Sequence, residues 1–224
     1  MVVNTAHRFI FIHVPKAAGT SLAAALACLS GNRTDWLART KHETLAAFLA
    51  AIPHRITPRD RELGLDPRTY SRCAFVRNPW DRLASLYRYL VEQRPRPEID
   101  GVGSFRHFLM LARDRTPWVT GLHSMRQQID FLSQPDGALE VAFLGHFEHL
   151  PEDTLRLGTC IGAPLLLPHL NRSSNADNDY RRSYDPETIA VVEVLFADDI
   201  RHFGYSFETA APSRRISGPL RTLR

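Results

Sequence analysis

Short β-prone apolar runs and longer runs with helical spacing alternate along this chain of 224 residues. The short runs predict buried strands, and the longer runs predict helices. The strands are expected at 8–14, 72–76 and 141–144, and the helices at 20–29, 43–51, 79–93, 151–161 and 186–203. This order predicts an α/β fold, with a single P-loop-like domain whose central, mostly parallel sheet is flanked by helices.

The remaining segments are expected to lie outside the regular core. Residues 30–40 and 52–71 are expected to be loops, and 98–125 is expected to be an irregular or helical insertion that faces the acceptor. From position 208 the composition turns to Pro, Ser and Arg, which is typical of a tail outside the packed core. We therefore expect one domain over 1–207 and a basic tail over 208–224.

The segment 9–22, FIFIHVPKAAGTSL, combines an apolar strand, a tight loop and the start of an Ala-rich helix. A helix N-terminus presents backbone N–H groups and positive dipole charge to an anion. Thr20 and Ser21 add hydroxyl groups, Lys16 adds a compact charge, and Gly19 allows the backbone to approach closely. The segment therefore predicts a phosphate-binding loop, although the Walker order is absent because the lysine precedes the glycine.

The segment 71–87, SRCAFVRNPWDRLASLY, repeats the order of strand, turn and helix. Asn78 suits the N-cap of the helix and Pro79 suits its first turn. Arg77 lies at the carboxyl end of the expected strand, where open α/β sheets bind ligands. Arg77 and Ser85 could therefore bind one phosphate group together, with the arginine using its planar fork.

Both segments also have an ordinary structural interpretation. The first could be a plain strand-to-helix turn with a solvated Lys16, and Asp81 and Arg82 could form a local surface ion pair. Lys16 and Lys41 are the only two lysines in the chain, and every other Lys or Arg position is arginine. Because the two side chains are not interchangeable, a lysine in this loop favours the phosphate-binding interpretation.

The two segments together resemble the nucleotide-binding motifs of sulfotransferases. Residues 13–22 resemble the 5′-phosphosulfate-binding loop, and residues 75–87 resemble the 3′-phosphate-binding motif. The residues of the two motifs are most similar to those of the carbohydrate branch, sulfotransferase family 2. This branch includes heparan 2-O-, chondroitin and dermatan sulfotransferases and bacterial relatives. Weaker similarities follow in the same order at 41–44, 128–132, 147–150, 167–173 and 184–187, so the resemblance covers roughly 8–207.

This resemblance implies a donor and its ligands. The donor would be 3′-phosphoadenosine-5′-phosphosulfate (PAPS), the product adenosine 3′,5′-bisphosphate, and no metal would be required. The implied 5′-phosphosulfate ligands are Lys16, Ala17, Gly19, Thr20 and Ser21. The implied 3′-phosphate ligands are Arg77 and Ser85, and Arg172 and Ser173 of a late loop would close over the nucleotide. Many relatives have threonine where this chain has Ala18, which removes one hydroxyl contact.

Transfer to a sugar hydroxyl group benefits from a general base that works near neutral pH. His42 is the first choice, because it lies between the two motifs and in the segment similar to a His-containing segment of the family. Its neighbour Glu43 is the alternative base. The ordinary interpretation of His42 is a surface histidine at a helix N-terminus, while His13 is expected to shape the loop at the end of the strand. The histidines show no metal-ligand pattern.

Charge and cysteine content narrow the class of protein. The formal net charge of +4 fits anionic ligands and is too small to indicate nucleic acid. No apolar run has the length of a transmembrane helix, and no signal peptide is evident. Cys28, Cys73 and Cys160 are expected to be buried free thiols. Animal relatives are usually anchored in the Golgi, and we expect this chain to be a bare catalytic domain of a cytoplasmic bacterial enzyme without a membrane partner.

Three functions therefore remain open. The first is a sulfotransferase whose acceptor is a hydroxyl group, expected to belong to a carbohydrate. The second is a small-molecule kinase that uses ATP and Mg²⁺, against which the absent Walker order counts. The third is a non-catalytic nucleotide- or glycan-binding domain. The acceptor would be selected by the loops at 30–40, 52–70 and 94–125.

Overall fold

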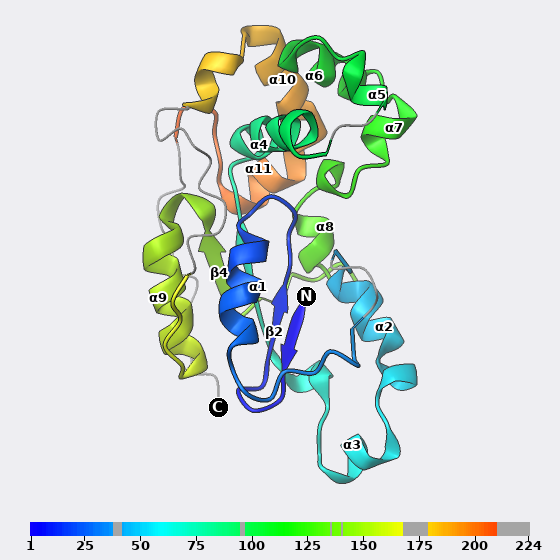
Figure 1. Ribbon diagram of the computed structural model, residues 1–224, viewed down its shortest axis with the longest axis vertical. Coiled ribbons are helices and arrows are strands. Elements are labelled where there is room, and N and C mark those ends of the chain that lie inside the picture. Colours follow the sequence, from blue (N-terminus) through cyan, green and yellow to red (C-terminus); the bar gives the residue numbers. More distant parts are fainter. Residues whose placement is uncertain (38–41, 95–96, 135, 140, 168–178, 210–224) are drawn as a thin grey trace. The chain divides into compact units, whose positions relative to one another are not determined.

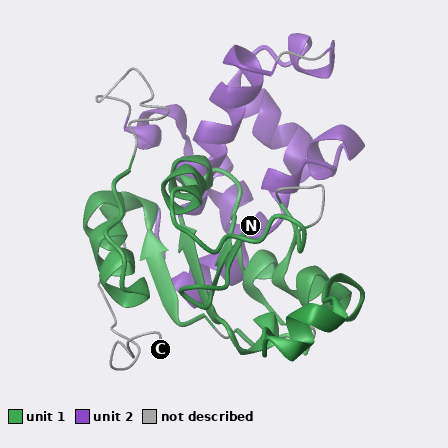
Figure 2. Cartoon of the chain, turned by 60° about the horizontal axis from the view of Figure 1, so that its bottom comes forward, with its two compact units in different colours: residues 1–76, 128–171, 216–224 green, residues 77–127, 172–215 purple. Residues whose placement is uncertain are grey.

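The computed structural model describes the chain except for residues 38–41, 95–96, 135, 140, 168–178 and 210–224. The chain divides into two compact units (Figure 2). Unit 1 comprises 1–76, 128–171 and 216–224, and unit 2 comprises 77–127 and 172–215.

Unit 1 contains a four-stranded sheet in the order β1-β2-β3-β4 (Figure 1). The strands are β1 (Val2–Asn4), β2 (Phe9–Ile12), β3 (Ser71–Val76) and β4 (Phe143–His146). β2, β3 and β4 are parallel, and β1 is antiparallel to β2. The predicted α/β fold with a mostly parallel sheet is confirmed. Because parallel strands end at the same edge, the residues that follow β2 and β4 lie at one edge of the sheet.

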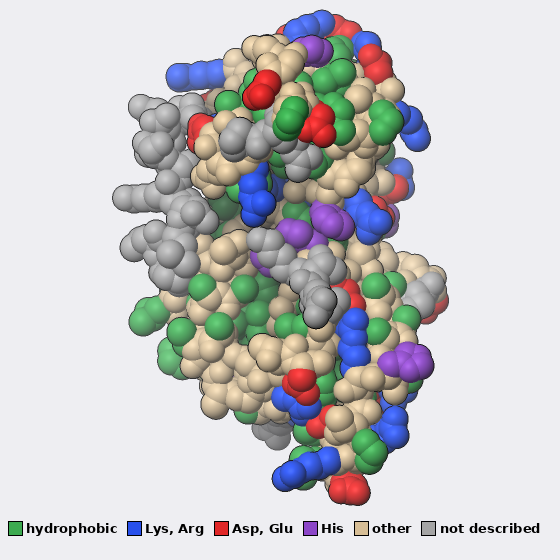
Figure 3. All heavy atoms as spheres, turned by 45° about the vertical axis from the view of Figure 1, so that its right-hand side comes forward, with side chains coloured by type: hydrophobic (Ala, Val, Ile, Leu, Met, Phe, Trp, Pro, Cys, Tyr) green, Lys and Arg blue, Asp and Glu red, His purple; other side chains and the backbone are tan. Residues whose placement is uncertain are grey.

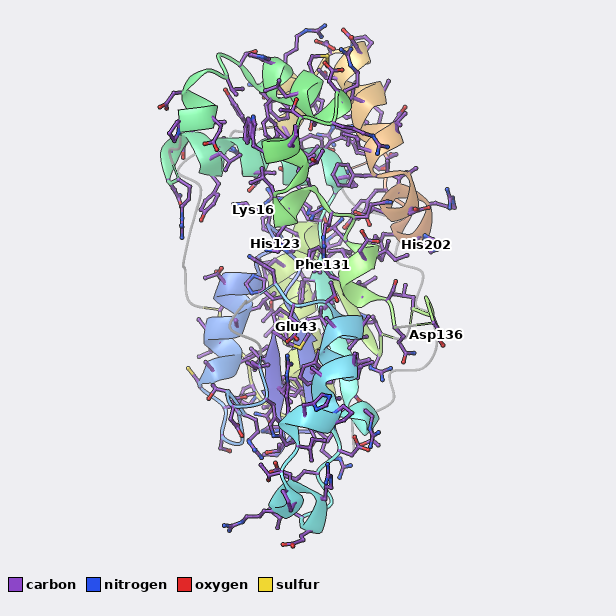
Figure 4. The ribbon with its side chains drawn as sticks, turned by 90° about the vertical axis from the view of Figure 1, so that its right-hand side faces the viewer. Lys16, Glu43, His123, Phe131, Asp136 and His202 are labelled. Atoms are coloured by element: carbon purple, nitrogen blue, oxygen red, sulfur yellow. The ribbon has the colours of Figure 1, made fainter. Side chains whose placement is uncertain are left out.

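Helices cover both faces of this sheet. Helix α1 (Gly19–Ala27) and helix α9 (Leu150–Ile161) contribute to the same hydrophobic cluster as one face of the strands. The buried residues of that cluster include Phe9, Phe11, Leu22, Leu26, Cys73, Phe75, Phe143, Leu157, Cys160 and Ile161. Ile10 and Ile12 alternate with Phe9 and Phe11 and are also fully buried. Figures 1 and 4 show the sheet between α1 and helix α2 (Leu45–Arg55), so α2 lies on the opposite side.

Side-chain caps fix where the helices of unit 1 begin. Helix α2 starts at Leu45 rather than at 43, because the hydroxyl group of Thr44 accepts a hydrogen bond from the Ala47 N–H at 3.2 Å. The short helix α3 (Pro58–Glu62) is closed by a capping box between Thr57 and Asp60. The other helical segments of unit 1 are η1 (Pro67–Thr69), α8 (Ile129–Leu132) and η3 (Phe147–His149).

The cysteine prediction is correct at two positions and wrong at one. Cys73 and Cys160 are buried free thiols in the core of unit 1, whereas Cys28 is exposed. Burial raises the pKa of the Cys73 thiol well above its usual range. Cys28 is exposed because it immediately follows the last residue of α1, where the buried face of the helix ends.

The described part of unit 2 is helical. Its elements are α4 (Pro79–Glu92), α5 (Pro97–Asp100), α6 (Phe105–Arg113), α7 (Pro117–Thr120), η2 (His123–Met125), η4 (Tyr180–Ser183), α10 (Pro186–Leu195) and α11 (Ala197–Phe203). The predicted insertion at 98–125 is thus largely helical. Basic and acidic side chains alternate on the surface over α6 and α10 (Figure 3), where Arg106 binds Asp185 and Glu187.

The predicted helix at 186–203 is interrupted at Phe196. This residue leaves the helical region with φ −123° and ψ 31°, and its side chain is fully buried. The Gln127 side chain then accepts hydrogen bonds from the N–H groups of Asp198 and Asp199, at 2.9 and 3.1 Å. This side-chain amide, which is distant in the sequence, thus provides the acceptor for backbone N–H groups in the first turn of α11. A second helix therefore begins at Ala197, a boundary that the spacing of the apolar residues does not predict.

Candidate active site

The loop between β2 and α1 has an unusual backbone. Lys16 and Ala18 both adopt left-handed conformations, with φ of 68° and 58°. Each such residue costs on the order of 1 kcal/mol or more when it is not glycine, and strain of this kind clusters at ligand sites. Alternation between left- and right-handed residues turns successive N–H groups toward one point and forms a concave anion-binding nest. The two left-handed residues are the backbone feature that this loop shares with such a nest.

Helix α1 begins directly at this loop, and its N-cap residue is Ala18. An alanine offers no side-chain oxygen, and α1 has no side-chain cap. The N-cap side chain therefore supplies no capping oxygen, and an anion could take that place at the helix N-terminus. Ala17, Gly19 and Ser21 are buried, Lys16 is half-buried, and Thr20 is exposed.

Two histidines lie beside this loop. His13, at the end of β2, is 5% exposed, and its ring packs against Gly19 so closely that a Cβ atom added there would lie 2.1 Å from His13 Cδ2. The His13 ring also contacts the His42 ring edge-on, with centroids 5.0 Å apart and planes at 72°. His42 is half-buried. The structure therefore brings the predicted base next to the predicted loop, with His13 as the link.

Replacing Gly19 with alanine should disturb this arrangement. The new Cβ atom must displace the His13 ring, which is buried and in contact with His42. We expect turnover to fall by about 10²-fold, because a misplacement of about 1 Å in a catalytic site can cost this much. Steady-state kinetics measures the loss. Gly101→Ala is the control, since Gly101 is exposed and an added Cβ atom there has no neighbour within 4 Å, and an equal loss in that variant would contradict the account.

Glu43, the alternative base, is engaged in a bidentate ion pair. Arg55 Nη2 donates to Glu43 Oε1 at 2.7 Å, and Arg55 Nη1 donates to Oε2 at 3.1 Å. Glu43 is 7% exposed, and it precedes α2 in the sequence (Figure 4). To act as a general base, Glu43 would have to present a carboxylate oxygen to the substrate, whereas both of its oxygens accept hydrogen bonds from Arg55. This geometry favours His42 over Glu43.

Unit 2 carries the other predicted phosphate ligands. Arg77, the residue after β3, is 8% exposed, and Asp81 binds it bidentately at Nε and Nη2, both at 2.9 Å. Ser85 is half-buried on α4, which Asn78 caps as predicted by accepting from the Trp80 N–H. Asp81 therefore orients the guanidinium group of Arg77.

The surface ion pair between Asp81 and Arg82 is absent, which corrects that interpretation. Arg82 is fully buried in unit 2, where it donates to the Arg126 carbonyl oxygen at 3.0 Å and lies 3.9 Å from Asp199. Its guanidinium group also lies over the Phe196 ring, with Cζ 5.7 Å from the ring centroid. Arg82 is thus a core residue, and Asp81 pairs with Arg77.

The late-loop ligands Arg172 and Ser173 lie outside the described residues.

Sequence reasoning missed the pairing of Arg55 with Glu43, the neighbour of His42. Arg55 is the last residue of α2, twelve positions after Glu43. Nothing in helical spacing pairs these two positions, because Glu43 precedes the helix that Arg55 ends. The same holds for the contact of His13 with His42, which lie in different elements.

Comparisons with known proteins identify relatives of this chain. The family model described as "Sulfotransferase family" matches residues 1–206. Carbohydrate sulfotransferase 14 of Mus musculus is 28% identical over 192 residues, which cover 76% of this chain and 48% of that protein. The Danio rerio protein of the same name is 28% identical over 187 residues (73% and 48%), and the Homo sapiens protein is 27% identical over 192 residues (76% and 48%). The chain thus spans about half the length of these relatives, and no solved structure matches it.

These relatives correct the predicted cytoplasmic location. Carbohydrate sulfotransferase 14 is a Golgi-type, membrane-anchored enzyme, so the similarity does not place this chain in the cytoplasm. No helix among the described residues is long and apolar enough to cross a bilayer. The predicted bacterial source is not tested by these animal relatives.

Proposed function

Because the chain belongs to the sulfotransferase family, we propose that it is an O-sulfotransferase that moves a sulfuryl group from PAPS to a hydroxyl group of a carbohydrate. The observation that carries the proposal is the loop between β2 and α1, whose left-handed Lys16 and Ala18 lead into a helix without a side-chain cap. The carbohydrate acceptor is supported by the relatives, which are carbohydrate sulfotransferases. The proposed domain covers 1–207, with a tail at 208–224.

The loop residues fit a bound phosphosulfate. In the proposed role, the N–H groups of Ala17, Gly19, Thr20 and Ser21 bind its oxygens, and the hydroxyl group of Thr20 adds an exposed donor. Lys16 neutralises the charge that develops on the oxygen between sulfur and phosphorus as the bond breaks. The same chemistry needs no metal ion, because the loop and the lysine supply the positive charge.

His42 acts as the general base in this proposal. Its imidazole accepts the proton of the acceptor hydroxyl group while the oxygen attacks sulfur, so no full alkoxide forms. The oxygen–sulfur bond to the donor breaks on the opposite side, and adenosine 3′,5′-bisphosphate leaves. His13 supports the His42 ring through their edge-on contact.

Arg77 and Ser85 are proposed to bind the 3′-phosphate, and Arg172 and Ser173 to complete the nucleotide site. A guanidinium group that Asp81 already orients loses little freedom when it binds a phosphate. The chain should then bind adenosine 3′,5′-bisphosphate more tightly than adenosine 5′-phosphate.

Arg77→Ala tests this assignment by isothermal titration calorimetry. Loss of a charge-assisted hydrogen bond costs about 1.5–3 kcal/mol, so affinity for the bisphosphate should fall roughly tenfold or more. Affinity for adenosine 5′-phosphate should stay nearly unchanged. Arg94→Ala, an exposed arginine just beyond α4, serves as the matched control and should bind like the unaltered protein. Equal affinities of the unaltered protein for the two nucleotides would reject the 3′-phosphate site.

A further inference from the structure

One arginine joins two places in the chain on either side of His42. Arg55 Nη1 donates to the Trp36 carbonyl oxygen at 3.1 Å and to Glu43 Oε2 at 3.1 Å, and Nη2 donates to Glu43 Oε1 at 2.7 Å. Trp36 and Glu43 flank the part of the chain that contains His42. A single guanidinium group therefore ties both sides of this part to the end of α2.

The two tied positions are buried. Trp36 is 1% exposed and Glu43 is 7% exposed, while the Arg55 side chain is 20% exposed. The Arg55 guanidinium group also lies over the Phe48 ring of α2, with Cζ 5.6 Å from the ring centroid. A bidentate arginine–carboxylate pair fixes orientation as well as distance. Because the carboxylate is shielded from water, salt weakens the pair less than a surface ion pair.

The geometry constrains His42 from two directions. Its backbone continues into Glu43, which Arg55 holds, and its ring rests against His13, which packs on Gly19. A catalytic group must be kept within about 0.5 Å of its productive position by neighbours that are themselves fixed. The Glu43–Arg55 pair holds the backbone next to His42, and His13 supports the His42 ring.

We propose that Arg55 is a positioning residue for the His42 base and acts through its bidentate pair with Glu43. The inference rests on the proposed function, because it presupposes that His42 takes the acceptor proton. It assigns to Glu43 the task of holding the base rather than of being the base. In this role neither residue would need to touch the donor or the acceptor.

The test combines kinetics with a double-mutant cycle. Arg55→Met removes the hydrogen-bond donors and keeps an apolar stem, and Glu43→Gln keeps the shape of its partner. We expect Arg55→Met to lower kcat by about 10- to 100-fold, since small misplacement of a base is costly. The KM for PAPS and the calorimetric affinity for adenosine 3′,5′-bisphosphate should change less than about twofold. Arg201→Met, whose exposed side chain on α11 also pairs with a carboxylate, that of Asp198, is the matched control and should retain normal kcat.

The double-mutant cycle distinguishes an effect of Arg55 on the position of His42 from a general effect on protein stability. In a His42→Ala background, Arg55→Met should cost little more, because a residue that acts through His42 has nothing left to position. Additive losses in kcat, or a loss of bisphosphate binding equal to the loss of kcat, would overturn the inference. Arg55→Lys keeps the positive charge and should therefore retain more of kcat than Arg55→Met. If Arg55→Met does not fold, kcat of Arg55→Lys is compared with that of the unaltered protein instead. Normal turnover in His42→Ala alone would instead reject the proposed base.

Discussion

Replacing His42 with alanine is expected to lower turnover by about 10²–10⁴-fold while leaving donor binding nearly unchanged. The imidazole would take the proton of the acceptor hydroxyl group, and removal of a general base affects the transition state rather than the bound donor. The ring contact with His13 places His42 beside the loop that is proposed to bind the donor. Turnover under saturating substrates, with bisphosphate affinity measured in parallel, checks this prediction.

The pH dependence of His42→Ala supplies an independent reading. An imidazole accepts a proton only in its neutral form, so the rate of the unaltered enzyme should rise with pH as this ring loses its proton. The variant should lack that rise. Glu43→Gln is the companion variant, and it should keep the rise while losing less turnover than His42→Ala. The reverse pattern, with Glu43→Gln inactive and His42→Ala near normal, would make the carboxylate the base.

Replacing Lys16 with alanine should reduce turnover by about 10²–10³-fold, which is more than the loss in nucleotide affinity. Charge on the oxygen between sulfur and phosphorus grows toward the transition state, so the ammonium group stabilises that state more than the bound donor. Alanine keeps a Cβ atom at the left-handed position 16, and the backbone preference of the loop is therefore changed less than it would be by glycine.

A charge-preserving variant completes the test of Lys16. Lys16→Arg keeps a positive charge but spreads it over a planar group, so it should recover only part of the lost turnover. Single-turnover kinetics and calorimetry with adenosine 3′,5′-bisphosphate give the two quantities to compare. If Lys16→Ala lost turnover and affinity by the same factor, the lysine would serve binding alone.

Local sequence patterns predicted the elements that position the candidate site. The Asn-Pro pair correctly marked where α4 begins, whereas the strand expected at 8–14 covers only Phe9–Ile12. β1 was missed because three residues are too few to show a period of two. The break at Phe196 was missed because the cap comes from Gln127, far away in the sequence.

Pairings between distant residues account for what the sequence did not reveal about the site. Lys16, Gly19 and His42 could be singled out from motifs, but the contact of His13 with His42 depends on how two elements pack. The pairing of Glu43 with Arg55, which favours His42 over Glu43 as the predicted base, crosses the length of α2. The partner of Asp81 was misassigned because Arg82 is adjacent in sequence, whereas its side chain is buried in the helical unit.

Transfer of radiolabelled sulfate from PAPS to a panel of carbohydrate acceptors tests the central claim most directly. The assay should include release of adenosine 3′,5′-bisphosphate in the same mixture, with ATP and Mg²⁺ as the alternative donor. The account predicts labelled carbohydrate and bisphosphate in equal amounts for at least one acceptor, with no phosphate transfer from ATP. Phosphate transfer from ATP, or an absence of labelled product across the panel despite tight bisphosphate binding, would contradict it.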